Sequence, residues 1–281
     1  MKPKLDDNKT FAILTDTTKC TGCETCVQAC KAENKLGRDR LWNWQQEIDT
    51  LSATRFCTVA RRPGRNYVRQ QCRHCLDAAC VSACLVGALQ KKENGAVIYD
   101  SGLCIGCRYC MMSCPFGIPR YEWDSAAPWV RKCTLCYHRL KEGRQPACTE
   151  ACPEKATIFG TRAEMLAEAR RRIAENPGKY YPADKPRIWG ETEVGGTSVL
   201  YLSNISLDFL GWAPELGDQP VPLLTWAVMK EVPWLALGVV GGMSAIYWFC
   251  GRRNRVRAAA VAEEMRRRGL EQQDQGKPAK G

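Results

Sequence analysis

The stretch that decides the fold is Cys104-Ile-Gly-Cys107-Arg-Tyr-Cys110-Met-Met-Ser-Cys114-Pro115. Its four cysteines are separated by two, two and three residues, and a proline follows the last of them. The same 2-2-3 spacing occurs earlier in the chain, from Cys20 to Cys30. Three closely spaced thiolates can surround a cubane of iron and sulfide, and the small Gly106 lets the backbone approach it. The spacing therefore predicts a [4Fe–4S] ligand loop.

Two further groups of four cysteines vary this spacing. The second motif opens the middle gap to four residues, and the fourth motif opens it to eleven and ends with Pro153. The four motifs contain sixteen of the eighteen cysteines, and only Cys57 and Cys250 stand alone. Because every motif has its four thiols, we expect four [4Fe–4S] clusters and no three-iron cluster.

The fourth cysteine of each motif is expected to bind the neighbouring cluster, because it begins a short helix that leads away from its own loop. An Asn94-Gly95 hairpin signal, of type I′, lies between the second and third motifs. Strand-like runs at 11–16 and 156–160 can meet outside the first and fourth motifs, so the pairing is nested. The expected ligand sets are Cys20, Cys23, Cys26 with Cys152; Cys133, Cys136, Cys148 with Cys30; Cys72, Cys75, Cys80 with Cys114; and Cys104, Cys107, Cys110 with Cys84.

Other uses of these residues fit less well. A chain of 281 residues buries a core without disulfide staples, and staples do not need four thiols in eleven residues. A structural zinc protein remains the alternative, although a zinc ribbon uses separated pairs of cysteines. The formal charge of +11 is not accompanied by a nucleic-acid-binding motif. No phosphate loop, paired nucleophile or dinucleotide motif occurs, so we expect no catalytic residues and no activity of the chain by itself.

Several residues near the motifs are assigned supporting roles. His74 and His138 are interpreted as residues beside the ligands or on the surface, and Cys57 as a buried free thiol. The positive charges of Arg73, Arg108 and Lys132 would raise a nearby cluster potential, with surface solvation as an equally good interpretation.

The chain divides into four parts. Residues 1–165 form the four-cluster domain, with an insertion at 31–71. Residues 166–231 comprise a helix, which starts at a Thr161–Glu164 capping box and ends near Glu175, and an extended region. This region includes a strand candidate at 197–203 and is interpreted as either a partner-contacting segment or a linker. The expected fold is α+β: tandem bacterial ferredoxin-like domains with a single C-terminal transmembrane helix.

The stretch from Val232 to Cys250 contains nineteen residues and no charge, which is close to the length of a membrane span. Seven arginines follow it, from Arg252 to Arg268. The positive-inside rule places the basic tail, 251–281, in the cytoplasm and the cluster domain on the periplasmic side. The polar N-terminus predicts no export signal, so we expect export together with a partner that has a twin-arginine signal.

The order of the four motifs, with Cys133-Thr-Leu-Cys136 and Gln145-Pro-Ala-Cys148-Thr-Glu-Ala-Cys152-Pro153, resembles the iron–sulphur (beta) subunits of the dimethyl-sulfoxide-reductase family of respiratory complexes. The layout after residue 157 is similar to the beta subunit of formate dehydrogenase and to the anchored subunit of hydrogenase-2-type enzymes.

The resemblance implies a large catalytic subunit, of the molybdopterin or tungstopterin type or the nickel–iron type. It also implies an integral membrane quinone-reactive subunit. Electrons would pass singly between these two partners. In the alternative, the chain serves another molybdopterin reductase and conducts electrons from quinol to the catalytic subunit.

Overall fold

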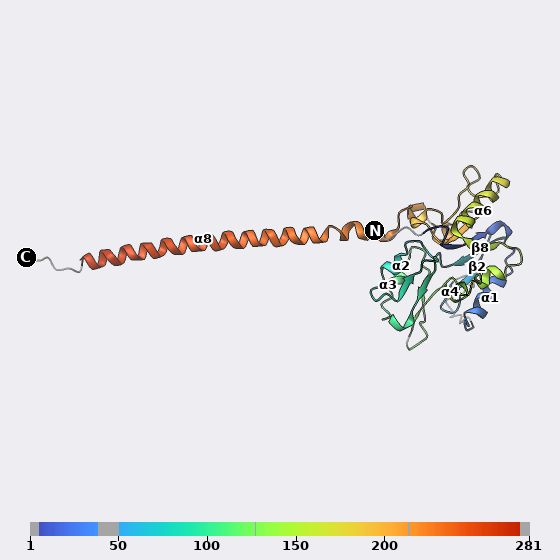
Figure 1. The fold of residues 1–281 in the computed structure, drawn as a ribbon, viewed down its shortest axis with the longest axis horizontal. Helices are drawn as coiled ribbons and strands as arrows, with labels where there is room; N and C mark the ends of the chain where they lie inside the picture. The colour runs from blue at the N-terminus through green and yellow to red at the C-terminus, as the bar shows by residue number, and fades with distance from the viewer. Residues whose placement is uncertain (1–5, 39–50, 127, 213, 276–281) are drawn as a thin grey trace, which may run out of the picture. The chain divides into compact units, whose positions relative to one another are not determined.

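The computed structural model describes residues 6–38, 51–126, 128–212 and 214–275, and the chain forms two units, 1–224 and 225–281. Helices and strands are mixed throughout the first unit, as expected for an α+β fold (Figure 1). The strands are β1 (Phe11–Asp16), β2 (Cys57–Arg62), β3 (Asn66–Gln71), β4 (Leu89–Lys91), β5 (Val97–Tyr99), β6 (Arg120–Tyr121), β7 (Val130–Arg131), β8 (Thr157–Thr161) and β9 (Val199–Leu202). The helices are α1 (Thr25–Glu33), α2 (Ala79–Ser82), α3 (Tyr109–Met112), α4 (Tyr137–Lys141), α5 (Ala147–Glu150), α6 (Arg162–Glu175), α7 (Val221–Met229) and α8 (Val232–Gln275).

A three-stranded sheet joins the two ends of the cysteine-rich region. Strand β1 pairs antiparallel with β8 and parallel with β9, in the order β8-β1-β9. The expected meeting of the strands outside the first and fourth motifs is confirmed. Helix α6 covers this sheet and buries Met165, Leu166 and Ala169 against Leu14 and Leu200. The sheet therefore holds the first and fourth motifs in one compact unit.

Helix α6 begins at the predicted capping box. The Thr161 side chain accepts from the Glu164 backbone N–H, and the Glu164 carboxylate accepts from the Thr161 N–H. Farther along, Arg172 donates to Asp16, which is fully buried and also accepts from the Tyr180 hydroxyl. These bonds tie α6 to the residue that leads into the first cysteine motif.

The hairpin between the second and third motifs forms, but its turn is not type I′. Strands β4 and β5 pair antiparallel, with Lys91 opposite Val97. The Lys92 N–H donates to the Ala96 carbonyl, which leaves a three-residue loop. Of the loop residues, Gly95 has a φ of +89° and Asn94 has no positive φ. A type I′ turn needs a positive φ at both central residues, whereas a three-residue loop needs it at one position only.

The segment after α6 packs against the rest of the first unit. Tyr180, Trp189, Leu207 and Trp212 are all at most 2% exposed, and β9 is buried along its whole length. The rings of Trp189 and Trp212 lie 6.2 Å apart in an edge-on contact. The linker interpretation is therefore wrong for residues 180–212, because their large apolar side chains complete the core.

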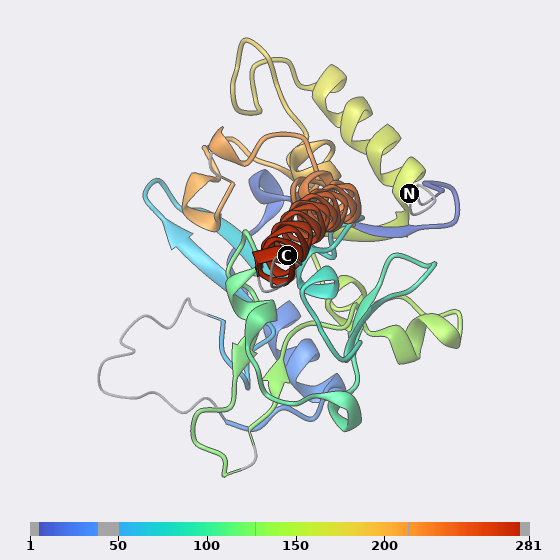
Figure 2. The ribbon, with the colours of Figure 1, turned by 90° about the vertical axis from the view of Figure 1, so that its left-hand side faces the viewer.

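The predicted insertion at 31–71 contains the β2–β3 hairpin, shown in light blue in Figure 2. Its residues 39–50 lie outside the described part of the chain. Strand β2 buries its first four residues, including Cys57 at 2% exposure, so the prediction of a buried Cys57 is confirmed. The hairpin thus adds apolar cover beside the first cysteine motif.

The second unit is dominated by α8, which Figure 1 shows as one continuous helix. Its apolar part, 232–250, is about 28 Å long at 1.5 Å per residue, close to the thickness of a bilayer core. Large apolar side chains project on all sides of it and are exposed, Trp234 and Phe249 among them. One helix of the described chain is thus long and apolar enough to span a membrane. Beyond Cys250 the helix continues through the arginine-rich segment.

Candidate metal centres

The first and third motifs have the same backbone conformation, as their sequence repeat predicts. In each, an aspartate caps a short 3-10 turn that leads to the first cysteine; these are Asp16 and Asp100. The glycines two residues after that cysteine have φ values of +74° at Gly22 and +72° at Gly106. Positive φ is favourable for glycine because it has no Cβ. Two residues later the chain is again left-handed and begins α1 or α3.

We name each set of four cysteines after the motif that contributes three of them. The first set combines three cysteines of the first motif with one of the fourth. Burial raises the pKa of the Cys20 thiol, and the charges of three neighbouring thiols raise it further. One cavity is lined by all four of these cysteines, together with threonines, Glu24, Glu154, Arg69, Val59 and Ala156. The first set is Cys20, Cys23, Cys26 and Cys152.

The fourth set contains the other cysteines of the same two motifs. Burial raises the pKa of Cys30 to about 12, and Cys148 and Cys136 add to the effect. Burial also raises the pKa of Cys133, and the charge of Cys30 raises it further. The fourth set is Cys133, Cys136, Cys148 and Cys30. The last cysteine of each motif therefore lies near cysteines of the other motif, and their sharing of a cluster stays a prediction.

The second and third motifs exchange their last cysteines in the same way. The pKa of Cys75 is raised by burial and then by Cys114, Cys72 and Cys80, which with Cys75 form the second set. The pKa of Cys110 is raised to about 11 by burial and then by Cys84, Cys104 and Cys107, which with Cys110 form the third set. The sixteen cysteines are thus neighbours in a way that is compatible with the four expected ligand sets, and their role as cluster ligands stays a prediction.

The four sets follow one another in series. After burial, which is the largest cause, the charge of a thiol in one set also raises the pKa of a thiol in the next. The linking neighbours are Cys26 with Cys148, Cys72 with Cys133, and Cys110 with Cys80. The resulting order is first, fourth, second, third. Exposed cysteines of the motifs occur only in the two terminal sets, at Cys23 and Cys107.

The surroundings of these sulfurs fit a [4Fe–4S] cluster. Backbone N–H groups point at the ligand sulfurs: Gly106 lies 3.4 Å from Cys104 Sγ, Leu135 3.3 Å from Cys133 Sγ, and Ile118 3.4 Å from Cys114 Sγ. Such donors stabilise the negative sulfurs of a cluster. Within the described ranges, no three His, Cys, Asp or Glu side chains come close enough to hold one metal ion.

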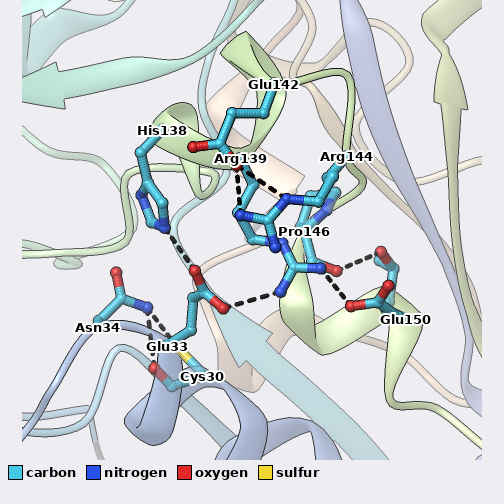
Figure 3. A network of polar contacts seen from close by, with 10 residues as sticks. Cys30, Glu33, Asn34, His138, Arg139, Glu142, Arg144, Pro146 and Glu150 are labelled. Carbon is cyan, nitrogen blue, oxygen red and sulfur yellow. Dashed lines mark hydrogen bonds and ion pairs between the residues drawn. The ribbon is translucent and has the colours of Figure 1, made fainter.

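A polar network fastens the first motif to the fourth, as Figure 3 shows. Glu33, at the end of α1, accepts from His138 at 2.6 Å and from Arg139 at 2.8 Å. These two donors, His138 foremost, hold the pKa of the Glu33 carboxyl below its usual value. Asn34 donates to the Cys30 carbonyl at 2.8 Å and to its Sγ at 3.7 Å. The network keeps Cys30 beside the motif with which it is expected to share a cluster.

His74 lies between the fourth and second sets. Burial lowers its pKa well below the usual value, so the imidazole is neutral. Its Nδ1 accepts the Val97 N–H at 2.9 Å, which leaves the proton on Nε2, 3.5 Å from Cys133 Sγ. His74 is therefore a donor to an expected ligand. His138, in contrast, is half exposed and bonds Glu33.

The interpretation of Arg73, Arg108 and Lys132 as solvated surface residues is wrong for two of the three. Arg73 is 1% exposed and Lys132 is 4% exposed, and Arg73 donates to Gln71, Tyr201 and Leu210. Arg108 is exposed and lies over the rings of Tyr121 and Trp123. Sequence reasoning also missed the buried Arg69, because an arginine in an alternating strand normally points to solvent.

Known proteins show the same organisation. Residues 64–162 match the family described as 4Fe-4S dicluster domain, which covers the second to fourth motifs. The hydrogenase-2 operon protein HybA of Escherichia coli O157:H7 is 35% identical over 74% of this chain and 74% of its own length. The formate dehydrogenase-O iron-sulfur subunit of Escherichia coli K12 is 37% identical over 70% of this chain and 68% of its own length. The probable anaerobic dimethyl sulfoxide reductase chain YnfG of the same strain is 37% identical over 63% of this chain and 86% of its own length.

These relatives differ in the enzyme named, and the formate dehydrogenase-O relative is named as an iron–sulfur subunit. The ferredoxin-like fold and the resemblance to iron–sulfur subunits are thereby confirmed. The chain belongs to the iron–sulfur, electron-transferring beta subunits of the dimethyl-sulfoxide-reductase family of respiratory complexes.

Proposed function

We propose that this chain conducts single electrons through four [4Fe–4S] clusters between a catalytic subunit and a quinone-reactive membrane subunit. The observation that carries the proposal is the serial arrangement of the four cysteine sets. The two terminal sets each have an exposed cysteine, whereas the two middle sets have none among the described residues. Electrons would enter at one exposed end and leave at the other.

The protein's own groups hold and tune the clusters. The sixteen thiolates would bind iron, and each cluster would supply a site that accepts and releases one electron. Backbone N–H groups, His74 and Asn34 donate hydrogen bonds to ligand sulfurs. Such donors and the burial of the sulfurs set each reduction potential.

The catalytic partner is expected to contain nickel and iron or a molybdopterin or tungstopterin cofactor. The similarity to a hydrogenase-2 operon protein and to a formate dehydrogenase-O subunit supports these two classes. The similarity to a dimethyl sulfoxide reductase chain supports a second candidate, in which electrons run from quinol to a molybdopterin reductase. Nickel, molybdenum and tungsten analysis of the purified complex distinguishes the nickel–iron class from the pterin class.

We expect about sixteen irons and sixteen sulfides per chain when the complex is purified without oxygen, because each of four clusters contributes four of each. A reductive titration followed by EPR should give magnetically coupled [4Fe–4S]⁺ signals. Zinc in place of iron would overturn the proposal in favour of a structural zinc protein. Half of the expected iron after anaerobic purification would contradict four clusters.

The cluster domain is expected on the periplasmic side, with the C-terminus in the cytoplasm. The seven arginines after the apolar span support this orientation through the positive-inside rule. In intact spheroplasts, an added protease should remove a tag from the N-terminus and leave a tag at the C-terminus intact. The opposite cleavage pattern would show that the orientation is reversed.

A further inference from the structure

Arg69, on β3, is a buried cation that has no acidic partner in the described part of the chain. Its side chain is 2% exposed, and its Nε–H donates to Cys57 Sγ at 3.1 Å. The two terminal nitrogens donate to Thr157 Oγ1, at 3.1 Å, and to Gln71 Oε1. Each of these acceptors is a neutral group in its ordinary state. A buried charge is costly unless an opposite charge lies close to it, so a negative group must be sought nearby.

The negative group lies in the neighbouring cysteine sets. Arg69 lines the same cavity as the four cysteines of the first set. Glu24 and Glu154 also line it, but Glu24 pairs with Arg61, and neither carboxylate is bonded to Arg69 in the described part of the chain. Burial opposes its charge, but nearby sulfurs, Cys148 of the fourth set foremost, outweigh this effect and raise the pKa of Arg69. Cys30, also of the fourth set, is within range of the same guanidinium. A cluster with four thiolates has a net charge of about −2 when oxidised and about −3 when reduced.

Cys57 connects Arg69 to the first set. Its sulfur accepts from Arg69, and its thiol lowers the pKa of the neighbouring Cys26. A thiol can accept and donate at once, so Cys57 is placed to relay the charge of Arg69 to Cys26, an expected ligand. Hydrogen bonds to ligand sulfurs raise the potential of a cluster.

The hairpin register explains how these residues reach the site. Cys57 lies opposite Gln71, and Val59 lies opposite Arg69, so these side chains share one face of the β2–β3 hairpin. On the same face, the ring of Tyr67 closely approaches Gly22 of the first motif; a Cβ there would lie 2.4 Å from the ring. The hairpin face is therefore held against the first cysteine loop.

We propose that Arg69, acting together with Cys57, is the counter-charge of the first and fourth clusters and raises their reduction potentials. The inference rests on the proposed function. Reduction adds one electron to a cluster and one unit of negative charge, and the guanidinium stabilises that added charge without a change of ligand. Arg69 is a tuning residue and not a ligand.

The test is a potentiometric EPR titration of the purified complex with Arg69→Gln. At the wild-type midpoints, we expect the ratio of oxidised to reduced cluster to rise about tenfold for the first and fourth clusters, a downward shift of about 59 mV for a one-electron couple. The second and third clusters, which do not contact Arg69, should keep their midpoints. Unchanged midpoints for all four clusters, with full iron content, would overturn the inference.

Arg61→Gln is the matched control, because it removes one positive charge from the same hairpin. The Arg61 side chain is 68% exposed and pairs with Glu24, which lies within the first motif. Water screens an exposed charge. Its loss should therefore change the ratio of oxidised to reduced cluster at each wild-type midpoint by less than twofold. An equal shift in both variants would contradict a specific role for the buried guanidinium.

Two further variants decide the matter if Arg69→Gln fails to assemble its clusters. Arg69→Lys keeps the charge. We expect the ratio of oxidised to reduced cluster at the wild-type midpoints to change by less than threefold. Cys57→Ala keeps the charge but removes the thiol beside Cys26. Only the first cluster's midpoint should fall, so that its ratio of oxidised to reduced form at the wild-type midpoint rises about threefold. No shift in Cys57→Ala together with a full tenfold shift in Arg69→Lys would overturn the inference. Loss of iron from the wild-type complex would instead count against the proposed function alone.

Discussion

Replacing Cys30 by alanine is expected to remove the cluster of the fourth motif and not that of the first motif to which Cys30 belongs in sequence. Iron should fall from about sixteen to about twelve per chain. Cys30 lies with Cys136 and Cys148 in the structure, and the polar network of Glu33 keeps it there. Because this set is second in the series, its loss interrupts the relay. Electron transfer to quinone should fall by more than the roughly 10- to 100-fold that loss of an outer partner of a metal site causes.

Three comparison variants make this result specific. Cys136→Ala should abolish the same EPR signal as Cys30→Ala, whereas Cys23→Ala should abolish a different one. Cys250→Ser should keep about sixteen irons, because this cysteine is exposed on α8 and belongs to no set. If Cys30→Ala and Cys23→Ala lost the same signal, each motif would hold its own cluster and nested exchange of the last cysteines would be wrong.

Val240→Arg is expected to release most of the chain from the membrane when the chain is produced without its partners. Val240 lies near the middle of the apolar part of α8, and its side chain is 62% exposed. An arginine at the centre of a membrane span costs about 2.5 to 3.5 kcal/mol in insertion. Such a cost lowers the inserted fraction by roughly two orders of magnitude at equilibrium. Carbonate extraction of membranes, followed by immunoblotting for the cluster domain, measures the fraction that remains.

Val256→Arg provides the control for this experiment. Val256 has the same exposure of 62% on the same helix but lies beyond Cys250, among the arginines. The added charge should therefore leave the membrane fraction unchanged. Retention of Val240→Arg in the membrane at the wild-type level would show that the apolar segment does not span the bilayer.

The sequence by itself determined the ligand loops and the ends of the main elements. Cysteine spacing within a motif is a local property, and the backbone repeats between Gly22 and Gly106 because the same residues impose the same positive φ. The α6 cap at Thr161 is equally local. The apolar length of α8 is also a property of one continuous segment. Local rules fix such features because the interacting residues are only a few positions apart.

The tertiary structure alone decided which charges are buried. By composition, Arg69, Arg73 and Lys132 are surface residues, since isolated burial of a cation is unfavourable. The fold brings Arg69 near Cys148, Arg73 near Cys114 and Lys132 near Cys80, all of them distant in sequence, and clusters bound there would supply the compensating negative charge. In the same way, residues 180–212 have no strong local pattern apart from the predicted strand at 197–203, which forms β9, but Trp189 and Trp212 complete the core. Both outcomes depend on contacts between residues far apart in the chain, and no local pattern records those contacts.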